Sequence, residues 1–330
     1  MKARILAVGS LTSDLFLKPR RYDVFQKENL DFIGFCLGDK VRIEERYDTY
    51  GGGGCNVAVG LARFGVPTDM LGMIGDGLTS ERILRNLTNE GVGQQHIQQT
   101  QEEKSGFSVI LSSESGERTV LFYPGANDYF SDFDESILEA YEGVCLQHLS
   151  GCSQNVFGKI RNYFVKHPQK FLSWNPGRES LEQGCQTYAD LIPVVDVLLI
   201  NQEEAQLFTG EKELEGMFQT FSQFGFQGNV IITNGMHGAT GWNGKELYFC
   251  PVYEGLDRVD TLGAGDSFMT GVVGGLLLGE DLPSSLKLAT INAAHVVSCY
   301  GSQTCLQSYE NLRKLADKIH IETKIFPLSA

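Results

Sequence analysis

Short apolar runs alternate with amphipathic segments along this chain, most regularly after about residue 144. Short apolar runs bounded by turn residues are typical of buried strands, whereas apolar residues at three- and four-residue spacing are typical of helices. Alternation of strand and helix indicates a mostly parallel sheet with covering helices. The predicted elements are strands at 5–8, 69–74, 105–111, 118–123, 144–149, 171–174, 194–200 and 230–233, and helices within 51–65, 80–90 and 266–300, the last broken around 279–283.

Two segments depart from this rhythm. Residues 15–50 are mixed in character, with charged, aromatic and short apolar stretches. Residues 104–127 hold two β-rich stretches separated by Ser-Glu-Ser-Gly-Glu at 113–117, which predicts a hairpin with a long turn. We find no repeat and no linker-like change in composition. The chain is therefore predicted to be one α/β domain over 1–330 with excursions at about 15–50 and 104–127.

The composition is that of an ordinary globular protein, with 330 residues, 42% apolar, 21% charged and a net charge of −14. This charge argues against nonspecific binding to nucleic acid or an anionic membrane. The N-terminal apolar run ends at Val8 and no run reaches transmembrane length, so a cytoplasmic protein is expected. The eight cysteines include no C-x-x-C pair and are expected to be reduced and mostly buried. The six histidines show no metal-ligand spacing.

The strongest chemical signal is DTLGAGDSF, which runs from Asp260 to Phe268. A Gly-Ala-Gly segment that enters a helix leaves backbone N–H groups unshielded, and missing side chains let an anion approach them. Asp266 lies beside these amides. It is either a helix N-cap or a general base that takes a proton from a hydroxyl while the amides stabilise a transferring phosphoryl group.

A second glycine-rich stretch, GGGGCN at 51–56, precedes a predicted helix. It is either a plain turn or a surface on which a small ligand rests against backbone, with Asn56 as donor and acceptor. It lacks the G-x-G-x-x-G pattern and acid of a dinucleotide-binding fold, and the chain contains no G-x-x-x-x-G-K-[ST] loop. Binding of ATP would therefore not use a P-loop lysine.

Polar residues also follow two predicted strands. Asn201 and Glu204 come after the strand at 194–200, where α/β sheets bind ligands. Glu204 could hold water on Mg²⁺, or it could belong to a solvated helix start. Asp14 follows the first strand, where it could grip substrate hydroxyls or cap a turn.

Taken together, GGGGCNVAVGLARFG and DTLGAGDSF resemble the ribokinase-like (PfkB-type) family of sugar and nucleoside kinases. The resemblance covers nearly the whole chain. It implies a three-layer α/β/α fold with a mostly parallel central sheet and a small β-sheet lid. Other segments similar to family motifs are GSLTSD, GMIGDG, GERTVLFYPGAN, WNPG, NQEE, ITNGMHG and the YGS turn near 301.

The resemblance also implies roles for individual residues. The implied set is Asp266 as the base, Gly263, Ala264 and Gly265 as the anion hole, Asp14, Gly52, Gly53 and Asn56 with Asp266 at the substrate, Asn201, Thr233, Gly235, Gly238 and Gly265 at the nucleotide, Glu204 at Mg²⁺ through water, and Asp260 at a monovalent cation such as K⁺.

The implied activity is in-line phosphoryl transfer from MgATP to a primary hydroxyl of a small sugar. Closure of the lid would exclude competing water, and lids of this kind often pair between chains, so a homodimer is expected. Two departures leave the acceptor open. Ribokinases carry a lysine where this chain has Gly53, and an acid where it has Ser150.

Several acceptors therefore remain candidates: ribose, a ketose, 2-keto-3-deoxygluconate and a nucleoside. Phe25, Phe32 and Phe35 lie in the long first excursion and could line an aromatic acceptor pocket, which would suit a nucleoside. The alternatives to a sugar kinase are thus a nucleoside kinase of the adenosine kinase kind and a non-catalytic family member that binds a ligand or partner.

Overall fold

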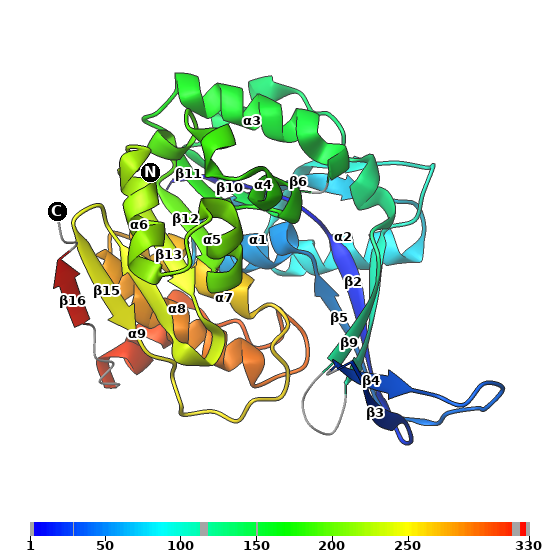
Figure 1. Ribbon diagram of the computed structural model, residues 1–330. Coiled ribbons are helices and arrows are strands. Elements are labelled where there is room, and N and C mark those ends of the chain that lie inside the picture. The colour runs from blue at the N-terminus through cyan, green and yellow to red at the C-terminus, as the bar shows by residue number, and fades with distance from the viewer. Residues whose placement is uncertain (1–2, 29, 113–117, 150, 319–323, 328–330) are drawn as a thin grey trace.

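A mostly parallel sheet forms the centre of the molecule in the computed structural model, which describes residues 3–28, 30–112, 118–149, 151–318 and 324–327. From β13 to β7 all neighbouring strands run parallel, and β14 to β16 extend one edge in antiparallel fashion (Figure 1). In spatial order the strands are β16 (Lys324–Pro327), β15 (Glu246–Cys250), β14 (Ala239–Trp242), β13 (Asn229–Thr233), β12 (Val197–Asn201), β11 (Phe171–Asn175), β10 (Gly143–Gln147), β1 (Ile5–Val8), β6 (Thr68–Ile74) and β7 (Gly93–Gln99).

Helices cover both faces of this sheet. One face packs against α3 to α6 and the other against α1, α7, α8 and α9, while α1 and α2 share a third apolar cluster with β1 and β6. The helices are α1 (Gly53–Arg63), α2 (Leu78–Asn89), α3 (Gln154–Lys166), α4 (Arg178–Gln183), α5 (Gln202–Thr209), α6 (Leu214–Gln223), α7 (Ala264–Leu277), α8 (Leu282–Val297) and α9 (Tyr309–Lys318), with short 3₁₀ turns η1 (Gly125–Tyr129), η2 (Glu135–Ala140), η3 (Gly151–Ser153), η4 (Cys185–Tyr188), η5 (Ile192–Val194) and η6 (Gly235–His237).

The strand β12 shows why the sequence folds in this way. Successive side chains of a strand point to opposite faces. Leu198 and Ile200 accordingly belong to the cluster under α3 to α6, whereas Val197 and Leu199 belong to the cluster under α7 to α9. A strand buried on both faces needs apolar residues at every position, and this explains the continuous apolar run.

The two excursions form a second sheet beside the central one (Figure 1). Within this sheet β2 pairs antiparallel with β5 and parallel with β8, and β8 pairs antiparallel with β9. The predicted three-layer fold with a small β-sheet lid is confirmed, whereas the 113–117 turn lies outside the described residues. The lid strands are β5 (Ile43–Gly51), β2 (Thr12–Pro19), β8 (Gly106–Ser112) and β9 (Arg118–Tyr123), and β3 (Asp23–Lys27) and β4 (Leu30–Gly34) form a separate hairpin.

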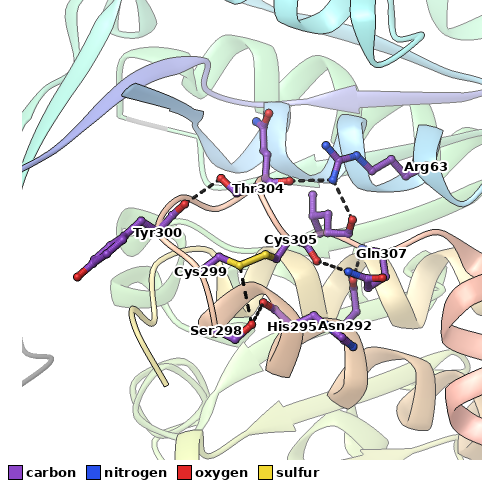
Figure 2. Close-up of a disulfide and its surroundings, with 11 residues drawn as sticks. Arg63, Asn292, His295, Ser298, Cys299, Tyr300, Thr304, Cys305 and Gln307 are labelled. Carbon is purple, nitrogen blue, oxygen red and sulfur yellow. Dashed lines mark hydrogen bonds between the residues drawn. A yellow bond between two sulfur atoms is a disulfide. The ribbon is translucent and has the colours of Figure 1, made fainter. Parts of the chain in front are cut away.

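The cysteines correct one expectation. Cys299 and Cys305 form a disulfide across the turn that follows α8 (Figure 2), so the prediction that all eight thiols are reduced is wrong for this pair. Close spacing in sequence and a turn that brings the two Cα atoms to 6.1 Å make the bond possible. Four of the free cysteines are buried, as expected, and two are exposed. Among the described residues, no helix combines the length and apolarity needed to cross a bilayer.

Candidate active site

The N-terminus of α7 is open toward a cavity. The helix starts after Gly263, whose left-handed φ of 79° and close approach to Ser302 exclude a side chain there. No side chain caps this end, so the interpretation of Asp266 as an N-cap is wrong. A methyl group added at Gly265 would meet no atom within 4 Å. The amide of Ala264 donates to the Thr261 carbonyl at 3.3 Å, whereas the backbone at Gly265 is open, as an anion site at a helix N-terminus requires.

The two glycine-rich motifs meet at Asp266. Asn56 lies in the first turns of α1, and its Nδ2 donates a hydrogen bond to Asp266 Oδ2 at 2.7 Å. A methyl group added at Gly53 would lie 3.6 Å from Asp266 Oδ1, so this glycine borders the same carboxylate. Gly52 precedes α1 with a positive φ of 91°, and a side chain there would overlap the carbonyl of Ser10. The predicted base, Asp266 of α7, thus adjoins the predicted substrate residues Gly53 and Asn56 of α1.

A residue that the sequence analysis missed completes this cluster. Gln303 is buried, and its Nε2 donates to Asn56 Oδ1 at 3.0 Å. Its Oε1 accepts from Asn86 Nδ2 of α2 at 2.9 Å. The turn around Gly301 was recognised from its resemblance to the family, but one polar residue in an irregular turn carries no periodic signal that would single it out.

Asp14 lies on β2 in the lid and is buried, with an exposed fraction of 3% for the whole residue. Burial raises the pKa of its carboxyl above the usual value, and hydrogen bonds from Ser108 and Thr12 partly oppose this shift. The charges of Asp14 and Asp266 both act on the thiol of Cys55, whose burial raises its pKa to about 12. Asp14 and Asp266 are thus both close enough to influence the same buried thiol.

A cavity of about 210 Å³ adjoins the start of α7. It brings together four of the five residues predicted for the nucleotide, namely Thr233, Gly235, Gly238 and Gly265, with Ala264. Its other walls are mostly apolar, a surface suited to a planar base, and the sequence analysis did not identify them. These additional apolar lining residues are Met236, Val252, Tyr253, Leu256, Phe268, Ala293, Ala294 and Val297.

Asn201 and Glu204 do not line this cavity. They form a capping box at the start of α5, in which Asn201 Oδ1 accepts from the Glu204 amide at 2.8 Å and Glu204 Oε2 accepts from the Asn201 amide at 2.9 Å. No group of three or more His, Cys, Asp or Glu side chains within the described parts of the chain could hold a metal ion. A single carboxylate of this kind fits Mg²⁺ that keeps several waters and phosphate ligands.

Asp260 links the lid to the α7 loop. Its Oδ1 accepts from the Leu262 amide at 3.1 Å and lies 3.4 Å from the Arg118 guanidinium of β9. Arg118 also donates to the hydroxyl of Thr261. Burial raises the pKa of the Asp260 carboxyl, whose Oδ2 is buried without a partner, so this oxygen fits a cation site. Arg118 was not predicted, and Ser150 lies outside the described residues.

The chain belongs to the family described as pfkB family carbohydrate kinases, whose model matches residues 23–308. Kinases of this family are ATP-dependent phosphotransferases. An ATP-dependent 6-phosphofructokinase of Thermoanaerobacterium thermosaccharolyticum is 23% identical over 311 residues, which cover 90% of this chain and 95% of that protein.

Two solved structures show the same ribokinase-like fold. A nucleoside kinase of Methanocaldococcus jannaschii is 20% identical, with a TM-score of 0.73 over 96% of this chain and 99% of that one. A putative ribokinase II from E. coli, solved in complex with ATP and Mg²⁺, is 18% identical, with a TM-score of 0.79 over 97% of this chain and 100% of that one. At these identities the likeness concerns the fold.

Proposed function

We propose that this protein phosphorylates a primary hydroxyl of a small sugar by in-line transfer from ATP, with Asp266 as general base. The observation that supports this most directly is the position of one carboxylate beside the open amides of α7. The cavity that holds the predicted nucleotide residues begins at the same helix end. Donor, acceptor and base would then converge within one turn of helix, the arrangement that in-line transfer requires.

In the proposed mechanism, Asp266 takes the proton of the attacking hydroxyl, and Asn56 holds the carboxylate in place through its hydrogen bond. The amides of Gly263, Ala264 and Gly265 stabilise the negative charge on the transferring phosphoryl group. Asn201 and Glu204 would hold Mg²⁺ through water, and the ion, when bound, neutralises phosphate charge.

A cation such as K⁺ would bind at the unpartnered oxygen of Asp260 and fix the conformation of the loop before α7. The positive charge of the cation would stabilise this carboxylate oxygen, which is buried and has no hydrogen-bond donor.

A sugar acceptor is favoured over a nucleoside by the surroundings of Asp14. The β2–β8 register places Asp14 and Ser108 on one lid face, where Ser108 hydrogen-bonds the Asp14 carboxyl, while Phe122 on the same face is 59% exposed. Phe25 and Phe32, the aromatic residues expected to suit a nucleoside base, instead stack on one another in the exposed β3–β4 hairpin. The proposed acceptor site thus combines Asp14, Asn56 and backbone glycines, groups that bind hydroxyls.

The decisive test is the variant Asp266→Asn, which keeps the shape of the side chain but cannot accept the proton. Turnover should fall by about three orders of magnitude or more, while folding and ligand binding persist. The inactive variant is then screened by thermal shift with MgATP plus ribose, fructose, 2-keto-3-deoxygluconate, fructose 6-phosphate or adenosine. A ligand at about 100 times its dissociation constant should stabilise the protein by about 2.7 kcal/mol.

Asp190→Asn serves as the matched control, because Asp190 pairs with Arg161 at the surface, away from the described site. It should leave turnover unchanged. Full activity of Asp266→Asn would contradict the role of the base. Stabilisation by adenosine alone would favour the nucleoside kinase, and ligand binding without turnover in the unmodified protein would favour a non-catalytic member.

A further inference from the structure

We infer that Gln303 is a positioning residue that fixes the orientation of the Asn56 amide and thereby the hydrogen bond received by Asp266. This inference rests on the proposed role of Asp266. Gln303 touches neither the proposed acceptor nor the carboxylate, and its effect passes through Asn56. Both amide side chains are buried, at 5% and 4% exposure, so water does not compete for their hydrogen bonds.

Three amide side chains form one chain of hydrogen bonds that ends at Asp266. Asn86 Nδ2 donates to Gln303 Oε1 at 2.9 Å, and Gln303 Nε2 donates to Asn56 Oδ1 at 3.0 Å. Asn56 Nδ2 then donates to Asp266 Oδ2 at 2.7 Å. These hydrogen bonds join α2, the turn after α8, α1 and α7, which are four elements distant in sequence.

The carboxylate of Asp266 sets the donor-to-acceptor direction of this series of hydrogen bonds. An ionised carboxylate only accepts hydrogen bonds, so Asn56 must present its NH₂ group to Asp266. Its carbonyl oxygen then faces Gln303, which must present NH₂ in turn. If residue 303 instead presented an oxygen, Asn56 would have an acceptor on both sides and only one NH₂ group to offer, so its hydrogen bond to Asp266 would be weakened. The side chain at 303 therefore decides how firmly Asn56 holds its donor toward the base.

Gln303 is held in place from both sides. The main-chain carbonyl oxygen of Gln303 accepts from the Arg63 guanidinium at 2.8 Å, and its side-chain Nε2 also lies 3.3 Å from the Cys55 sulfur. The adjoining Ser302 packs against Gly263, the residue that precedes α7. The turn that carries the amide is thus fixed relative to both helices that carry the site.

The test compares isosteric substitutions. Gln303→Glu replaces the donor by an acceptor of the same shape, and Gln303→Met removes both functions. We expect kcat/KM to fall about tenfold in Gln303→Met and further in Gln303→Glu. In Gln303→Glu the acid limb of the kcat/KM profile should also move upward by about one pH unit, because a second carboxylate then competes with the base for the Asn56 donor.

Other ionisable groups face this region and are controlled for. They are Cys55 and Arg63 on α1, Glu90 after α2, Asp14 and Arg118 of the lid, Asp260 before α7, and His148 after β10, whose ring lies beside Gly53. Gln307→Glu adds the same charge in the same turn, but Gln307 bonds the Cys305 carbonyl rather than the amide chain. It should leave the acid limb unchanged, and the profiles are repeated with His148→Gln to remove the imidazole.

Asn86→Asp provides a second variant at a half-buried position that tolerates a carboxylate, should Gln303→Glu fail to fold. It should reverse Gln303 and move the acid limb in the same direction by a smaller amount. In an Asn56→Ala background, Gln303→Met should have no further effect on kcat/KM. An acid limb that stays fixed in both carboxylate variants, or that moves equally in Gln307→Glu, overturns the inference. Loss of activity in Asp266→Asn shows separately whether the proposed base stands.

Discussion

Asp14 shows at the scale of one residue how a binding site can oppose stability. Its carboxyl is buried in the lid, and burial raises its pKa despite hydrogen bonds from Ser108 and Thr12. A carboxyl with a higher pKa in the folded chain than in the unfolded chain costs stability once the pH rises above the unfolded value. Hydroxyl groups of a ligand would donate hydrogen bonds to the same desolvated oxygens and stabilise them. The stability cost of burying Asp14 and its proposed role in binding therefore have one origin.

We therefore predict that Asp14→Asn raises the melting temperature at pH 7 and lowers activity. The gain should shrink as the pH falls toward about 4, where both folded and unfolded carboxyls become protonated. The measurement is thermal unfolding of both proteins between pH 4 and 8. Asp134→Asn is a control of opposite sign, because hydrogen bonds from Ser136 lower the pKa of that exposed carboxyl. A melting-temperature difference that does not change with pH would contradict the argument.

At the scale of an element, the turn from Cys299 to Cys305 joins the lid to both glycine-rich motifs. Tyr300 stacks on Tyr47 of β5 with ring centres 4.6 Å apart, and Ser302 packs against Gly263. Internal bonds add to the disulfide, such as that from the Thr304 hydroxyl to the Tyr300 carbonyl at 2.8 Å (Figure 2). A short covalent loop therefore carries groups that fix the lid, the anion site and Asn56.

Opening this disulfide should destabilise the protein measurably. The bond closes a loop with a sequence separation of six residues, and its chain-entropy contribution is about 2 kcal/mol. We predict a lower free energy of unfolding with a dithiol reductant, matched by Cys299→Ser with Cys305→Ser in non-reducing buffer. Alkylation of the denatured, unreduced protein should modify six of the eight cysteines. Modification of all eight would show that the pair is not bonded.

The elements that the sequence predicted are those with an apolar pattern. β12 and α7 are buried on most sides, and their apolar residues gave both type and approximate extent. The edge strand β7 was missed because its sequence GQQHIQQ is mostly half-buried and polar, with Ile97 as its one large aliphatic residue and no apolar alternation. The site shows the same division: Asp266 and Asn56 belong to local motifs, whereas Gln303 acquires its role only through contacts with α1 and α2.

At the scale of the whole molecule, both faces of the lid leave an apolar side chain of β9 exposed, and Phe122, on the face of Asp14, is 59% exposed. One face carries Asp14 toward the proposed acceptor site. The register of β2, β8 and β9 gathers Leu15, Val109 and Leu121 on the opposite face, and Leu121 is 56% exposed. An apolar sheet face that helices of the same chain leave partly exposed is typical of an interface. The homodimer through the lid, which the family resemblance implies, stays a prediction, and this face is where we expect the second chain to bind.

The expected dimer gives the last prediction. Leu121→Glu should place a charge on the outer lid face and convert a dimer into a monomer in light scattering, because an unpaired charge is costly to bury in an interface. Val24→Glu is the matched control, since Val24 is 61% exposed on the β3–β4 hairpin, outside the four-stranded lid sheet. If the interface also restrains the lid, the Leu121→Glu monomer should show a raised KM for the acceptor at an unchanged distribution of secondary structure. An unmodified protein that is monomeric at micromolar concentration would show instead that the apolar outer face serves another purpose, and the lid would then close on the site without help from a second chain.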